Sequence, residues 1–202
     1  MKKWVYLLIA VLGNALGTAL MANTFMGMTA WGSSAFNTAN LFQISLGTSF
    51  IILSVFFYIL AVLINRKFVF KEMVSSALFL VSFSLLADLF VSWFPSFEGY
   101  QFVYRLLINV LGMIVLLFSI ALHIKVHIAV HPMDVFLHAV QMKIGVAKGT
   151  YVAYFMGFSI ALIAGNLYGG IENIGIGTLL TLACSGILMR FFNDKILVYV
   201  MI

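Results

Sequence analysis

The sequence predicts an all-α membrane protein with six transmembrane helices in two inverted-topology three-helix repeats. Each repeat is expected to carry one short re-entrant or interfacial helix. The first observation is composition: of 202 residues, 64% are hydrophobic and 8% are charged, whereas roughly a quarter of a soluble domain is charged. A soluble fold of this size could not bury so much apolar surface. The other observations are six long apolar runs and two helix-length connections with matching spacing.

Each long apolar run can cross a bilayer, because a spanning helix needs about 20 mostly apolar residues. In lipid such runs form helices, since no water is available to satisfy a free backbone. The first run follows two lysines, as in a signal peptide, and we interpret it as an uncleaved first helix. The six predicted spans are 4–22, 47–64, 74–94, 104–124, 151–168 and 174–192.

The basic residues predict the orientation of the spans. With the N-terminus inside, all of the 11 Lys and Arg residues except Arg105 fall on the cytoplasmic side, which is a positive-inside pattern. If 30–44 and 132–146 also crossed the membrane, this bias would weaken. We therefore expect six spans with both termini cytoplasmic. The net charge of +5 lies at segment ends and forms no basic face, so nucleic acid is not an expected partner.

Two connections between spans are too long for simple turns. In the first, residues 31–44 carry no charge, which is unusual for a loop in water. The second lies in the stretch 123–150, which holds all 4 histidines. There Pro132 suits a first helical position and Asp134 would complement the helix dipole from the first turn. We expect each connection to form a short helix, either dipping into the membrane or lying at its surface.

The two connections repeat at an offset of 102 residues. Trp31 is followed 16 residues later by Gly47-Thr48, and Met133 by Gly149-Thr150. Each half contains three spans, so the second half must enter the membrane from the opposite side. This arrangement is an inverted repeat, which is common among secondary transporters. We divide the single membrane domain into a first repeat, an outer linker and a second repeat at 1–94, 95–103 and 104–202.

Three motifs indicate relatives. The first half carries Gly13-x-x-x-Gly17, Ala22-Asn23, Gly27 and Trp31. The second half carries His131-Pro132-Met133-Asp134, and then the glycine-rich stretch with Gly169, Gly170, Gly175, Gly177 and Thr178. Together they resemble the YczE/YyaS/YitT family of bacterial integral membrane proteins, nearest its YczE type without a C-terminal soluble domain. Ala30 and Gly32 depart from the Pro and Asp of the family's first element. The resemblance implies a multi-pass protein of the bacterial inner membrane.

Polar residues within spans, and at the starts of the short helices, are the candidate functional groups. Acids at membrane depth are usually functional, so Asp134 is a candidate cation or proton site, with helix capping as the alternative. Four-residue spacing of His123, His127 and His131 would favour a metal or a proton relay on one helix. Pro132 interrupts that helix, so we expect titrating interfacial histidines and no metal or cofactor. The residues expected to line a substrate or ion pathway are Asn14, Trp31, Asn109, His131 and Asp134.

Asp88 lies inside the third span, where burial of a charge is costly. It should therefore face the protein interior or the outer headgroups. The 102-residue offset pairs Asp88 with Arg190, and an inverted repeat would put these two residues near opposite faces of the membrane. Gly13 and Gly17 are expected at a close helix contact.

No residue pattern indicates a catalytic site, so we do not expect an enzyme. We expect a small secondary transporter or flippase with a neutral or weakly polar substrate bound between the halves. The alternatives are a substrate-binding subunit of a vitamin uptake complex, with Gly13, Gly17 and Ala22 as its docking face, or a regulatory or scaffolding protein without transport activity. The expected partners are membrane lipid and a small molecule, and association with a second copy or another protein is left open.

Overall fold

The computed structural model describes residues 2–68, 70–128 and 130–200, and within these residues it contains helices and no strand. Six helices are long and apolar enough to cross a membrane, which confirms the predicted spans. They are α1 (Lys2–Thr24), α3 (Leu46–Asn65), α4 (Phe70–Trp93), α5 (Phe102–Val126), α7 (Val146–Tyr168) and α8 (Ile176–Phe191). A π-helical turn (Phe192–Ile196) and a 3-10 turn (Leu197–Tyr199) continue α8.

Two shorter helices, α2 (Ala30–Phe42) and α6 (Pro132–Ile144), form where the long connections predicted them. Both have 13 residues, and both ends of α6 follow those of α2 by the same 102-residue offset. Each helix begins with a side-chain cap. Thr29 Oγ1 accepts the Gly32 N–H at 3.0 Å, and His131 Nδ1 accepts the Met133 N–H at 3.3 Å. These caps satisfy N–H groups that have no partner within the helix.

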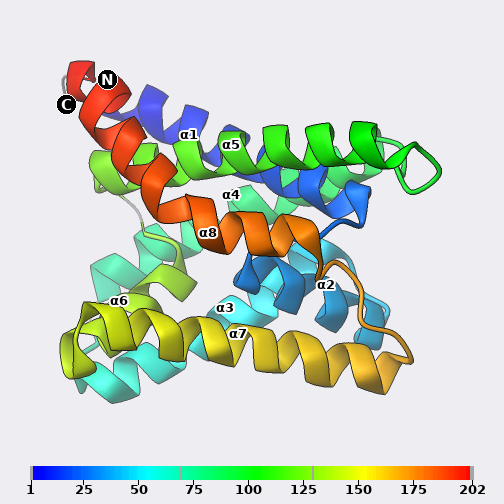
Figure 1. Cartoon of the computed structure of the whole chain (residues 1–202). Helices are drawn as coiled ribbons and strands as arrows, with labels where there is room; N and C mark the ends of the chain where they lie inside the picture. The colour runs from blue at the N-terminus through cyan, green and yellow to red at the C-terminus, as the bar shows by residue number, and fades with distance from the viewer. Residues whose placement is uncertain (1, 69, 129, 201–202) are drawn as a thin grey trace.

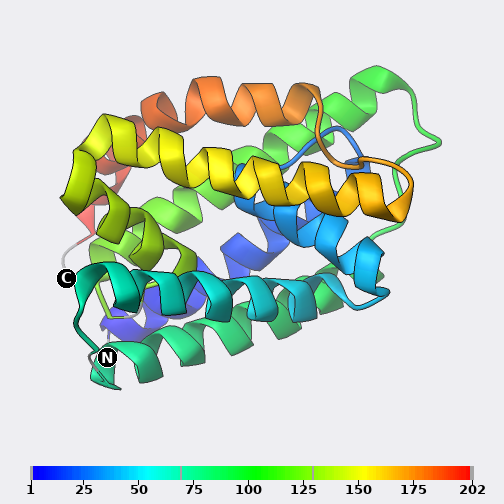
Figure 2. The ribbon, with the colours of Figure 1, turned by 90° about the horizontal axis from the view of Figure 1, so that it is seen from below.

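The helices form two layers. One layer contains α4, α1, α5 and α8, and the other contains α3 and α7 with α2 and α6 between them (Figures 1 and 2). At one edge of the molecule α3 packs against α4 and joins the layers. At the other edge, among the described residues, α7 and α8 are not one of the helix pairs that pack closely. The two layers are therefore closed along one edge and open along the other.

The close helix contact predicted at Gly13 and Gly17 joins α1 to α5. A Cβ atom at Gly17 would lie 2.6 Å from the Gly112 carbonyl oxygen and 2.6 Å from the Leu116 nitrogen. Both of these are backbone atoms, so they cannot move aside as a side chain can. Glycine therefore allows the two helices to approach closely, and α1 is an integral part of the bundle.

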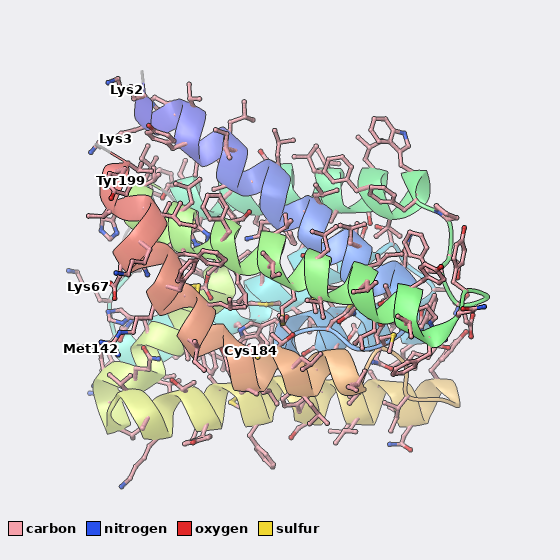
Figure 3. The ribbon with its side chains drawn as sticks, turned by 45° about the horizontal axis from the view of Figure 1, so that its top comes forward. Lys2, Lys3, Lys67, Met142, Cys184 and Tyr199 are labelled. Carbon is pink, nitrogen blue, oxygen red and sulfur yellow. The ribbon has the colours of Figure 1, made fainter. Side chains whose placement is uncertain are left out.

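Both chain termini lie at one end of the bundle, which we call the terminal end, and the opposite end is the far end (Figure 1). Lys2, Lys3 and Lys67 gather at the terminal end beside Tyr199 (Figure 3). This grouping agrees with the charge pattern in the sequence. The side of the membrane that the terminal end faces stays a prediction.

Replacing Gly17 with Val should lower the thermal stability of the purified protein, because overpacking a close contact costs about 1–3 kcal/mol. Gly186→Val is the matched control, since a Cβ at Gly186 of α8 meets nothing within 4 Å. Both substitutions place the same β-branched residue in a helix. Thermal denaturation in detergent measures the difference, and equal stability of the two variants would contradict the close contact.

Candidate functional site

A cavity of about 1140 Å³ lies between the two layers, slightly larger than the range of about 300–1,000 Å³ for small-molecule sites. The N-terminal ends of both short helices open onto it. Residues 29–31 contribute from α2, and His131, Met133 and Asp134 contribute from α6. Because the N-terminus of a helix carries partial positive charge, two such charges converge on the cavity.

The cavity brings together residues that are far apart in the sequence. Its wall also includes Thr18 of α1 and, on α8, Thr181 and Ser185. Four of the five residues predicted to line a pathway are in this wall, and their function in transport stays a prediction. The four are Asn14, Trp31, His131 and Asp134.

The fifth residue, Asn109, lies outside the cavity wall. Its buried side-chain amide donates to Thr24 Oγ1 and to the Gly27 carbonyl oxygen, both at 2.9 Å. Arg105 donates to the Thr24 carbonyl oxygen at 2.8 Å on the same side of the bundle. These bonds hold the end of α1 and the turn after it against α5. Asn109 thus joins helices, which is a common role for a polar residue in a membrane span.

Asp134 is the acid of the cavity. Its Oδ2 atom lies 3.6 Å from Nε2 of His123 on α5, and the carboxylate interacts electrostatically with Tyr154 on α7. The side chain retains 29% exposure in the cavity wall. Burial raises the pKa of Asp134 from its ordinary value of 3.8 to about 7. The carboxyl group therefore gains and loses its proton near neutral pH.

The histidines occupy different environments. His131 packs against Phe83, and burial, followed by the charge of His123, lowers the pKa of His131 to about 3. Its neutral ring accepts at Nδ1 and therefore carries its proton on Nε2. His123 is fully buried, and neither ring nitrogen has a hydrogen-bond partner within the described part of the chain. His127 ends α5 with a left-handed φ of 52°, so the histidines do not share one helix face.

Asp88 fastens α4 to the start of α3 at the far end of the bundle. Its Oδ2 accepts the Ser45 hydroxyl and its Oδ1 accepts the Gly47 N–H, each at 2.6 Å. A Cβ at Gly47 would overlap the Ser84 carbonyl oxygen, so α3 and α4 touch here. A carboxylate at a helix N-terminus also complements the helix dipole. We call this contact the Asp88 clasp, and sequence reasoning did not identify it.

No equivalent clasp joins α7 to α8 among the described residues. The Arg190 side chain, at the 102-residue offset from Asp88, is 86% exposed and lies 3.6 Å from Asp194 of its own segment. Gly149, the counterpart of Gly47, packs against Gln141 of α6. Asp88 and Gly47 hold α3 to α4, whereas Arg190 and Gly149, at the 102-residue offset, do not hold α7 to α8.

The cavity opens at this unfastened edge. Tyr151 and Phe155 of α7 line it and are also 77% and 73% exposed, and Leu182 of α8 is exposed on the opposite wall. This edge is formed by two spans, and it faces lipid if the protein lies in the membrane as its composition predicts. The opening is therefore lateral.

A family model matches residues 1–194. The chain belongs to DUF6198, a family of unknown function. No curated protein and no solved structure matches the chain. Membership of DUF6198 does not indicate an activity, and the cavity is the feature of the molecule that points to one.

The glycine-rich segment of this DUF6198 protein, 169–178, holds α2 as well as turning the chain. Asn37 donates to the Glu172 carbonyl oxygen at 2.7 Å and accepts the Glu172 N–H at 2.9 Å, and Ser33 Oγ donates to the Asn173 carbonyl oxygen at 2.7 Å. Sequence reasoning missed these residues. The sequence signal for them was that Ser33 and Asn37, two polar residues four positions apart, lie in a helix without charged residues.

The glycines predicted as structural motifs have separate positions. Gly169 ends α7 with a left-handed φ of 108°. The Gly175 N–H donates to Thr178 Oγ1 at 3.3 Å where α8 begins, and the Gly177 N–H donates to the Met26 carbonyl oxygen at 2.8 Å. A side chain at Gly170 would meet nothing within 4 Å.

Infrared difference spectra between pH 6 and pH 8 should contain a carboxyl C=O stretching band that Asp134→Asn removes. Burial raises this pKa, so the folded protein retains a proton that the unfolded chain loses above about pH 4. Stability should therefore fall as pH rises from about 4 to 7 and level off above that. Asn14→Ala, which changes the same cavity without removing an acid, should keep the band. An unchanged spectrum in Asp134→Asn would contradict the assignment.

Proposed function

We propose that this protein is a small secondary transporter or flippase with its substrate site in the cavity between two inverted halves. The supporting observation is that the N-terminal ends of α2 and α6 line one cavity. Transporters of inverted-repeat design bind substrate where helix ends point into a midplane cavity. Chain breaks at membrane depth are tolerated where they line such a cavity. The YczE-type resemblance of the motifs is consistent with this architecture.

The helix contacts support the inverted repeat. α1 packs on its counterpart α5, α2 packs on α7 as α6 packs on α3, and α1 contacts α4 as α5 contacts α8. The exception is that α3 and α4 pack together whereas α7 and α8 do not. An alternating-access protein has one closed and one open portal, because the two halves exchange conformations. In this proposal α3 and α4, fastened by the Asp88 clasp at the far end, form the closed portal, and α7 and α8 form the open one.

The start of α7 and the end of α8, which contribute to the wall of the cavity, lie towards the terminal end (Figure 1). The positive-inside pattern favours a cytoplasmic terminal end, so this state would open sideways into the inner half of the bacterial plasma membrane. The cavity wall is mostly apolar and holds one acid, Asp134. Such a wall favours a neutral or weakly polar substrate over a multiply charged one.

The alternative of a vitamin-uptake subunit requires an exposed docking face on an early helix. The small residues that would form its docking face include Gly13 and Gly17, and these pack against α5 within the chain. A scaffolding role without a ligand gives no reason for two helix ends to meet at a cavity. The transporter or flippase is therefore the function that the site supports best.

Proteoliposomes test this function. Exchange of radiolabelled neutral or weakly polar solutes, and flipping of fluorescent lipids, should exceed that of protein-free vesicles for at least one compound. Gly186→Trp should reduce this rate, because a side chain at Gly186 projects into open space at the cavity wall. A panel without any flux above protein-free vesicles would overturn the proposal.

Removing the Asp88 clasp should open the far end of the cavity. A hydrogen bond to a charged group contributes about 1.5–3 kcal/mol, so Asp88→Ala should raise the open fraction about tenfold or more. The measurement uses a cysteine in place of buried Thr18, with Cys184→Ala removing the native thiol, and labelling by an impermeant maleimide from the far side. Glu98→Ala, an exposed acid in the α4–α5 connection, is the control. Equal labelling in the two variants would contradict a gate at Asp88.

A further inference from the structure

We propose that the ligand of this cavity is an amphipathic amine, an apolar molecule with one cationic nitrogen, which binds Asp134 and enters from lipid between α7 and α8. This inference rests on the proposed function and narrows the weakly polar substrate to one chemical class. Two observations carry it: a carboxylate without a permanent counterion, and a lateral opening with apolar walls.

Among the described residues, Asp134 has no permanent cation beside it. The groups that interact with it are His123 from α5 and Tyr154 from α7. The other basic side chains of α6 and α7 are exposed, namely His138 and Lys143 of α6 and Lys148 of α7. The packed parts of α3 and α4 add no charge, since α3 has no charged residue and residues 73–87 of α4 have none. A buried charge without a partner is costly. The carboxyl group must therefore take up a proton or receive a cation from the cavity.

An organic ammonium suits this site better than a metal ion or an anion. Metal ions with oxygen ligands require several oxygens, and Asp134 is the one acid of the wall. An ammonium needs only one carboxylate and donates hydrogen bonds to it. An anion would be repelled by the ionised Asp134. The N-termini of α2 and α6 disfavour positive charge, so the cavity suits one cationic group, whose charge the Asp134 carboxylate balances, and no further positive charge.

Two aromatic rings of the cavity wall add to the attraction, and one of them, Tyr154, interacts electrostatically with Asp134. The ring centroids of Trp31 and Tyr154 lie 6.2 Å apart, at an interplanar angle of 83°, and both residues line the cavity. The faces of Trp and Tyr attract organic cations. The acid and the rings together form a site for a single cationic nitrogen on an apolar body.

The walls between α7 and α8 suit the apolar part of such a molecule. Tyr151 and Phe155 on one side and Leu182 and Met189 on the other line the cavity up to its opening. Gly186 leaves room between them, because a Cβ there would have no neighbour within 4 Å. An amine with a hydrocarbon tail dissolves in the bilayer and reaches this opening without leaving it.

Binding exchanges a proton for the amine. The ammonium pairs with the Asp134 carboxylate as the carboxyl proton leaves through the cavity to solvent, so the net charge of the site is unchanged. Burial raises the pKa of Asp134 to about 7, which makes this exchange reversible near neutral pH. The proton and the amine thus compete for one group, and movement of one can be coupled to movement of the other in the opposite direction.

The test compares decylamine, decanol and decanoate, which share one tail length. Trp31 reports binding by its fluorescence in a chain with Trp4→Phe and Trp93→Phe, since those two tryptophans lie exposed on the outside, and empty nanodiscs supply the background. Decylamine should bind tightest, and about tenfold more tightly at pH 8 than at pH 6, because the ionised fraction of a group with pKa about 7 rises by about that factor. Asp134→Asn should remove both the preference for the amine and the pH dependence.

The route of entry has its own matched pair of variants. Gly186→Phe should weaken decylamine binding at least tenfold, whereas Gly170→Phe, at a glycine with equally open surroundings outside the cavity, should not. Phenylalanine leaves Trp31 as the reporter. Unchanged binding in Gly186→Phe would overturn lateral entry, as would a dimer that covers the opening. Equal binding of all three ligands, unaffected by Asp134→Asn, would overturn the amine class and leave a transporter of neutral substrates standing. Failure of all three ligands to bind would overturn the inference, while the flux panel decides the proposed function separately.

Discussion

The structure depends on satisfying backbone polar groups inside the helical bundle. A helix that starts inside the bundle has N–H groups without a partner in their own helix. At α2 the Thr29 hydroxyl accepts one of these groups, and at α6 His131 does so while Pro132 removes another. The glycine-rich segment then holds α2 through Asn37 and Ser33. These bonds allow two helix ends to meet at a central cavity.

The two acids that lie inside the bundle differ in how their carboxylate oxygens are satisfied. Each stands near the N-terminus of a short or long helix, where the dipole favours a carboxylate. Asp88 receives the Ser45 hydroxyl and the Gly47 N–H, so both of its oxygens are used in holding α3 to α4. Within the described part of the chain, the Asp134 carboxylate accepts no hydrogen bond: His123 Nε2 lies 3.6 Å away, Tyr154 interacts with it electrostatically, and the side chain lines the cavity. The first acid is therefore structural, and the second is available to a proton or ligand.

The sequence predicts the spans and the short helices well because both depend on local properties, namely apolar length and capping residues. The 102-residue offset then shows the same pattern a second time in the other half. The cavity residues Trp31, His131 and Asp134 follow from these helix starts. Asn109 and the Asp88 clasp do not, because their partners lie 41 to 85 residues away. An apolar residue that faces lipid also resembles one that faces a cavity, so the gap between α7 and α8 leaves no trace in hydropathy.

Electrostatics explains why one edge closes and its counterpart does not. The N-terminus of α3 meets the carboxylate of Asp88, an attractive arrangement. If α8 approached α7 in the same way, Arg190 would occupy the position of Asp88 and face a helix end whose cap, Gly145, has no side chain to offer. The positive charge of Arg190 would then meet the partial positive charge of the α7 N-terminus, and the contact would be unfavourable. The edge between α7 and α8 therefore does not close by copying the Asp88 clasp. Its closure requires a different contact, for which a cation bound to Asp134 is our proposed component.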